Sequence, residues 1–209
     1  MVHDLLREAI RALLQEKGEM MPIPKRLGGS IAYYKIKNPV GKIALVMPGI
    51  NHPRYSPDMP KTVMEKAEGY LKDFSYVVPN GPGVSVAVAL SAIDKDKKVD
   101  VNAASEKILI GHSAGGNNVL RYLATGGGSM FSRIYLLDPT PSVTSLPPAI
   151  GAKTVLIHNY LNWSNPAERR TKFIELGKSI IASGGVAEEN TMGHMAILDE
   201  GLRRAALGL

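Results

Sequence analysis

Hydrophobic positions along the chain form short apolar runs that alternate with segments of helical period. Runs such as KILI, IYLL and TVLI are apolar on both faces, which is typical of parallel strands covered on both sides. The expected strands are residues 31–37, 42–47, 75–79, 107–111, 133–137, 153–157 and a weaker one near 185–187. The expected helices are residues 58–73, 84–95, 115–125, 166–183 and 195–207.

This alternation predicts the α/β class: a doubly wound, mostly parallel sheet of about six or seven strands with helices on both faces. One segment, VSVAVALSAI at 84–93, alternates like a strand. We predict a helix there, because two parallel neighbours need a crossover and nothing else between residues 80 and 106 supplies it. The Pro/Ser/Thr-rich loop between 137 and 153 is too short for a cap domain, so we expect an open site.

The N-terminal segment has the helical period over residues 3–16, followed by the irregular stretch GEMMPIPKRLGG. We therefore expect one domain over 1–209, with an N-terminal helix and linker at 1–29 and a core at 30–209. Charges interrupt the N-terminal helix every few residues, unlike a secretory signal. No apolar run approaches the roughly 20 residues that cross a bilayer.

The composition is that of a globular protein, with 44% hydrophobic and 21% charged residues. The net charge of +6 would suit nucleic acid, but the basic residues are scattered, and the densest cluster, DKDKKVD at 94–100, contains three aspartates. We therefore expect no nucleic-acid partner. The absence of cysteine excludes disulfides and suits a reducing compartment, so we expect a cytoplasmic protein.

The segment Gly111-His112-Ser113-Ala114-Gly115 matches G-x-S-x-G. It directly follows the predicted strand KILI and opens the helical stretch NNVLRYLA, the strand–turn–helix setting of a nucleophile elbow. Glycines are needed at its ends because strand and helix approach closely there. An incidental serine in a glycine-rich turn is the alternative, and the strand–helix context favours a nucleophile.

With these residues the chain resembles the α/β-hydrolase superfamily over about residues 31–205, on GHSAGG, the strand–helix order and a late GHMAIL. The resemblance implies a serine nucleophile followed along the chain by an acid and then a histidine. His194, in TMGHM between the last strand and the last helix, stands where the superfamily has its general base. His158, at a strand end, is the alternative base or a pocket residue.

The position of the acid is unusual. The superfamily usually carries it after the penultimate strand, but there HNYLNWSNPAE has three asparagines and no carboxylate before Glu168. Asp138, at the end of the preceding strand, is the predicted acid, as in some superfamily members. Glu168, a triad oriented by asparagine, and a purely turn-forming role for Asp138 before Pro139 remain alternatives.

The resemblance also places an oxyanion hole after the strand KIALVM, where Pro48 replaces the histidine that the superfamily often has. We assign the hole to the backbone N–H groups of Ile50 and Ala114. Candidate substrate-binding residues come from the loops after two strands: Asn51, His52, Arg54, Tyr55, His158, Tyr160 and Trp163.

The sequence thus predicts a serine hydrolase that cleaves a carboxylic ester of a small-molecule or lipid-like acyl group through Ser113, His194 and Asp138. It predicts no cofactor and no metal, since no two histidines have ligand-like spacing. Amide, peptide or thioester cleavage by the same residues is one alternative. The other is a non-catalytic binding module that keeps the fold, which the missing carboxylate at the usual acid position favours.

Overall fold

A computed structural model describes residues 30–38, 40–53, 56–96 and 101–209. These residues form a seven-stranded sheet in the order β1-β3-β2-β4-β5-β6-β7, in which β1 is antiparallel to β3 and the other neighbours are parallel. The strands are β1 (Ile31–Lys35), β2 (Lys42–Met47), β3 (Phe74–Pro79), β4 (Glu106–His112), β5 (Arg133–Leu137), β6 (Thr154–His158) and β7 (Val186–Glu189). The predicted α/β class and mostly parallel sheet are therefore confirmed.

The helices also follow the hydrophobic pattern. They are α2 (Met59–Tyr70), α3 (Val86–Asp96), α4 (Ala114–Ala124), α5 (Pro148–Gly151), α6 (Pro166–Ala182) and α7 (His194–Leu207), with a short 3-10 helix η2 (Tyr160–Asn162). The ambiguous segment 84–93 contributes to helix α3, as the crossover argument requires. The helix predicted within 1–29 lies outside the described residues. None of the described helices has the length and apolar character that a membrane crossing requires.

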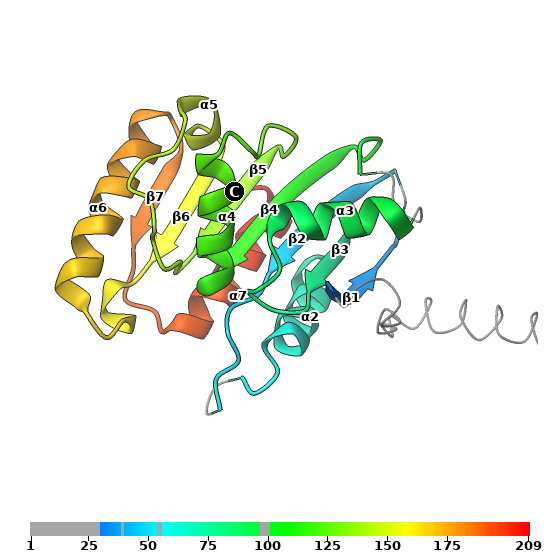
Figure 1. Ribbon diagram of the computed structural model, residues 1–209, viewed down its shortest axis with the longest axis horizontal. Coiled ribbons are helices and arrows are strands. Elements are labelled where there is room, and N and C mark those ends of the chain that lie inside the picture. The colour runs from blue at the N-terminus through cyan, green and yellow to red at the C-terminus, as the bar shows by residue number, and fades with distance from the viewer. Residues whose placement is uncertain (1–29, 39, 54–55, 97–100) are drawn as a thin grey trace, which may run out of the picture.

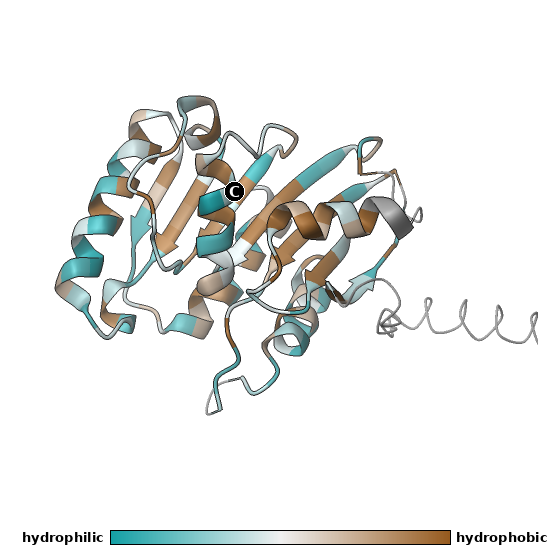
Figure 2. Cartoon of the chain, in the orientation of Figure 1, coloured by the Kyte–Doolittle hydropathy of each residue, from teal (hydrophilic) through white to brown (hydrophobic). Residues whose placement is uncertain are grey.

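The helices cover both faces of the sheet and define two apolar layers (Figure 1). Helices α3, α4 and α6 pack against residues such as Leu45, Leu109 and Leu136. Helices α2 and α7 pack against the intervening residues, such as Val46 and Ile110. The central strands are therefore hydrophobic along most of their length, whereas α6 also carries many hydrophilic residues (Figure 2). This is the pattern expected of parallel strands buried on both sides.

The parallel strands bring distant loops to one edge of the sheet, because their C-terminal ends all lie there. The N–H of Ser113, directly after β4, donates to the carbonyl of Leu137 at 3.0 Å. The N–H of Asp138, directly after β5, donates to the carbonyl of Ile157 at 2.7 Å. Residues that follow β4, β5 and β6 are thus held beside one another by the sheet itself.

Candidate active site

Ser113 occupies a sharp turn between β4 and α4. Its backbone has φ 57° and ψ −126°, in the region that non-glycine residues rarely adopt. The flanking glycines allow this turn. A Cβ at Gly115 would lie 2.3 Å from the Met47 carbonyl oxygen, and one at Gly111 would lie 2.7 Å from the Gly116 Cα. The close approach of strand and helix that the motif predicted is therefore present on both sides of Ser113.

Ser113 lines a pocket of about 540 Å³. The loop after β2 forms the adjacent wall, where a Cβ at Gly49 would lie only 2.8 Å from the Ser113 Cβ. Most other walls are apolar, and they come from Ile50, Met59, Trp163, Met195 and Ala196. His194 also lines the pocket, so the serine and the late histidine face the same space.

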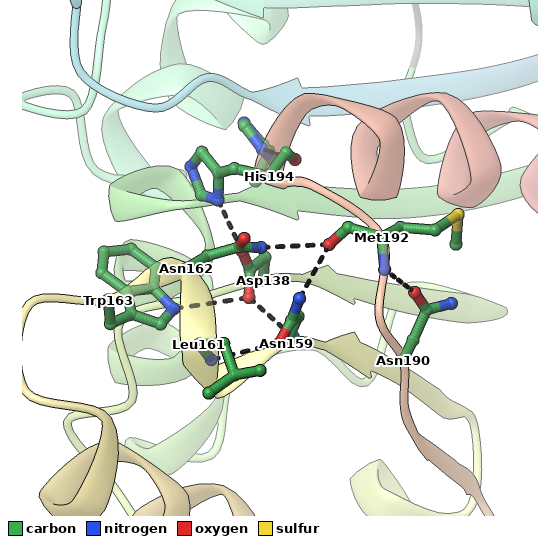
Figure 3. A network of polar contacts seen from close by, with 9 residues as sticks. Asp138, Asn159, Leu161, Asn162, Trp163, Asn190, Met192 and His194 are labelled. Carbon is green, nitrogen blue, oxygen red and sulfur yellow. Dashed lines mark hydrogen bonds and ion pairs between the residues drawn. The ribbon is translucent and has the colours of Figure 1, made fainter.

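Asp138 and His194 form the shortest polar contact of this region. Asp138 Oδ2 lies 2.5 Å from His194 Nδ1, and the aspartate is completely buried (Figure 3). Asp138 has φ 44°, so its backbone, like that of Ser113, adopts a conformation that costs free energy. A buried carboxylate on one ring nitrogen fixes the tautomer of the histidine and leaves its other nitrogen free to accept a proton.

Three N–H groups from the segment after β6 donate to the Asp138 carboxylate. They are the Asn159 backbone N–H at 3.0 Å, the Asn162 side-chain amide at 2.8 Å and, more weakly, the Trp163 indole at 3.4 Å. Buried carboxylates need such donors, because an unpaired charge away from water is costly. The loop that lacks the usual acid therefore supplies the donors for a carboxylate on the neighbouring strand.

The same asparagines hold the loop that carries His194. The side-chain amides of Asn159 and Asn162 donate to the Met192 carbonyl at 3.0 Å and 3.3 Å (Figure 3). The sequence analysis considered these asparagines only at the usual position of the acid, as a missing carboxylate or as an alternative that would orient the histidine directly. The signal that could have indicated them is their position in a loop directly after a predicted strand, at the same edge of the sheet as Ser113.

His112 contacts His194 through a hydrogen bond and through its ring. Its Nε2–H donates to the His194 carbonyl at 3.1 Å, and the two ring centroids are 4.5 Å apart. Burial, together with the nearby His194, lowers the pKa of His112 to about 3. His112 therefore stays neutral at ordinary pH and acts as an uncharged donor. The sequence analysis assigned no role to His112 beyond its place in the G-x-S-x-G segment, because this contact depends on which loop the sheet brings beside it.

The structure separates the remaining candidates into two groups. Ile50, His52 and Trp163 line the pocket, and Ala114 begins α4 directly after Ser113. Trp163 also lies edge-on to His194, with ring centroids 5.3 Å apart. Arg54 and Tyr55 lie outside the described residues.

Three other candidates are placed away from the pocket lining. The Asn51 side chain accepts the Met59 N–H at 2.9 Å at the start of α2. His158 is buried and stacks on Phe173 at 4.1 Å, and burial lowers its pKa. Tyr160 packs against the core.

The alternative acid Glu168 is exposed on α6 and pairs with Lys172 at 2.7 Å, whereas the His194 ring is bonded to Asp138. No group of three or more histidine, aspartate or glutamate side chains in the described residues is arranged to hold a metal ion.

Comparison with known proteins finds no matching family model and no matching curated relative. Solved structures do match. The LpqC poly(3-hydroxybutyrate) depolymerase of Bordetella parapertussis has a TM-score of 0.58 at 12% identity, over 82% of this chain and 80% of that one. Poly(aspartic acid) hydrolase-1 of Sphingomonas sp. KT-1 has a TM-score of 0.53 at 12% identity, over 85% and 91%.

A third match is MGS-M1, an α/β hydrolase enzyme from a Medee basin deep-sea metagenome library, with a TM-score of 0.52 at 14% identity, over 78% and 76%. At such identities the likeness concerns the fold. The protein has the α/β-hydrolase fold, with its strained serine at the turn where that fold has its nucleophile. The resemblance inferred from GHSAGG is thus confirmed at the level of the fold.

Proposed function

We propose that the protein is a serine hydrolase that cleaves carboxylic esters, with Ser113 as nucleophile, His194 as general base and Asp138 as the acid of the triad. The observation that carries the proposal is the 2.5 Å contact between buried Asp138 and His194, because His194 lines the same pocket as the strained Ser113. Two of the structural neighbours are named as a depolymerase and a hydrolase, which agrees with bond cleavage.

In the proposed reaction, Ser113 Oγ attacks the acyl carbonyl carbon while His194 Nε2 takes the hydroxyl proton. The carbonyl oxygen becomes an oxyanion, which accepts hydrogen bonds from the N–H groups of Ile50 and Ala114. The oxyanion collapses, the ester C–O bond breaks, and the imidazolium gives its proton to the leaving alcohol. Water then attacks the acyl-serine by the same route and releases the acid and free Ser113.

Asp138 stabilises the imidazolium that forms in both steps, and its buried hydrogen bonds keep the carboxylate in place. The contact also weakens the case for a non-catalytic module, because Asp138 provides His194 with the carboxylate that the usual acid position lacks. Rates on matched ester, thioester and amide substrates with the same acyl group will separate ester hydrolysis from the other acyl transfers.

Labelling with a fluorophosphonate probe tests the proposal directly. We expect the wild type to be labelled and Ser113→Ala to remain unlabelled, with ester turnover lowered about 10⁶-fold. Ser129→Ala, a serine outside the pocket lining, is the matched control and should behave as wild type. A folded wild type that neither reacts with the probe nor hydrolyses esters would contradict the proposal.

A further inference from the structure

The walls of the pocket are mostly apolar, and an arginine lies over the aromatic ring of one wall residue. Among the described residues, no lysine, arginine, aspartate or glutamate lines the pocket. The guanidinium carbon of Arg169 lies 5.7 Å from the centroid of the Trp163 ring, which does line the pocket. The same indole lies edge-on to the His194 ring, with ring centroids 5.3 Å apart.

Arg169 is held in place by an aromatic ring and not by an acid. Arg170 is held similarly, 5.2 Å from the Tyr160 ring centroid. In the described part of the chain, neither guanidinium forms an ion pair with a carboxylate. The adjacent Glu168 instead accepts from Lys172 at 2.7 Å and from Asn165 at 2.9 Å. This differs from Arg204, whose guanidinium pairs with Glu188 and Glu200 at 2.8 Å and 2.7 Å.

The position of Arg169 and Arg170 along α6 is a second difference from Arg204. Arg169 and Arg170 follow closely on Pro166, the first residue of the helix, where the helix dipole disfavours cations. An arginine stacked on an aromatic ring keeps its N–H edge free, and that edge matches the two oxygens of a carboxylate. The positive charge is thus oriented by the indole and partly shielded from water, and no carboxylate of the described residues forms an ion pair with it.

We propose that Arg169, held over Trp163, is a subsite for a carboxylate at the far end of the substrate. The substrate class is then an ester with an apolar spacer of several carbon atoms between the scissile carbonyl and the anionic group. The spacer lies along the apolar pocket wall, and the carboxylate reaches past the indole to the guanidinium. This inference depends on the ester hydrolysis proposed above and specifies its substrate.

Matched substrates test the subsite. The mono-p-nitrophenyl esters of adipate and suberate carry a terminal carboxylate where p-nitrophenyl hexanoate and octanoate carry a methyl group. The measured quantity is the ratio of kcat/KM for each anionic ester to that for its neutral partner. In wild type we expect this ratio to exceed one, and in Arg169→Gln we expect it to fall about tenfold, since a charge-assisted pair is lost. Arg169→Lys should keep part of the preference.

Lys178→Gln is the matched control, because it removes one exposed positive charge from the same helix far from Trp163. Its ratio should equal that of wild type. A ratio that Arg169→Gln leaves unchanged, or that Lys178→Gln lowers equally, overturns the subsite. If no ester is hydrolysed and no fluorophosphonate label appears, the proposed function itself fails.

Binding gives a readout that does not need turnover. Trp163 is the single tryptophan of the chain, so its fluorescence reports directly on this wall. Adipate added to Ser113→Ala should change the Trp163 emission with a saturable profile that weakens at high salt. The Ser113→Ala/Arg169→Gln double variant should require about tenfold more adipate, and equal affinities in the two proteins would contradict the subsite.

Discussion

The two halves of the site are built in different ways. Ser113 is positioned by close packing of the turn between β4 and α4, including packing against the end of β2, where Gly111 and Gly115 leave no space for a side chain. Asp138 and His194 lie 56 residues apart and are positioned by side-chain and backbone N–H donors from a third segment, Asn159–Trp163. The first half therefore depends on shape and the second on hydrogen bonds. Substitutions in the two halves should consequently damage stability and turnover to different degrees.

Among the substitutions that test this difference between the two halves, Asp138→Asn should have the largest effect, and that effect is on turnover. The amide cannot stabilise the imidazolium and favours the wrong tautomer of His194, so kcat should fall about 10⁴-fold while the protein stays folded. Ester hydrolysis and circular dichroism measure the two consequences. Glu168→Gln removes the alternative carboxylate, which is exposed and paired with Lys172, and should change kcat less than twofold. Unchanged hydrolysis in folded Asp138→Asn would reject the triad assignment.

Substitution of the glycines around Ser113 should instead lower the stability of the folded protein. In Gly115→Ala the new Cβ meets the Met47 and Pro48 carbonyl oxygens at 2.3 Å and 2.4 Å, and backbone cannot move aside cheaply. We expect the free energy of unfolding to fall by about 3 kcal/mol, measured by urea denaturation. Gly69→Ala, at an exposed position in α2 with nothing within 4 Å, is the control and should be neutral or slightly stabilising. Equal stability of the two variants would refute this account of the elbow.

The same contrast explains what the sequence could predict. The sheet, the helices and the elbow follow from local periodicity and from glycine spacing, and the crossover argument placed α3 correctly. Asp138 could be predicted as the partner of His194 because it follows directly after a strand, in the part of the chain between Ser113 and His194. The roles of Asn159, Asn162 and His112 could not be found, since they depend on which loops the sheet brings together. Nor did periodicity predict α5 or η2, because these helices are too short to show a helical period.

His112 belongs to both halves of the site, because it directly precedes Ser113 and bonds to the His194 carbonyl. Its contribution to the free energy of unfolding depends on pH. Its folded-state pKa, about 3, lies below the value of roughly 6.5 expected when unfolded, so the unfolded chain binds the proton first. The resulting stability is complete above pH 6.5 and is lost as the pH falls toward 3. From pH 7.5 to pH 5 this loss is about 2 kcal/mol.

His112→Gln keeps a side-chain N–H donor but does not titrate, so its free energy of unfolding should fall less than that of wild type over this range. Urea denaturation at both pH values measures the difference. His158, whose pKa burial also lowers, contributes equally to both proteins and cancels. Identical pH dependences would show that His112 does not become protonated on unfolding in this range.

The smallest expected effect comes from Asn162→Ala, which removes the 2.8 Å hydrogen bond to Asp138 and the 3.3 Å bond to the Met192 carbonyl. Asp138 keeps its other donors, so kcat should fall about tenfold and not abolish turnover. Asn165→Ala is the matched control, because that side chain bonds to exposed Glu168 and should leave kcat unchanged. Asn162→Asp places a second carboxylate against Asp138 and should lower kcat further than alanine does. If Asn162→Ala and Asn165→Ala had the same kcat, the acid and base would be positioned by the sheet edge alone, and the two halves of the site would not differ in how they are held.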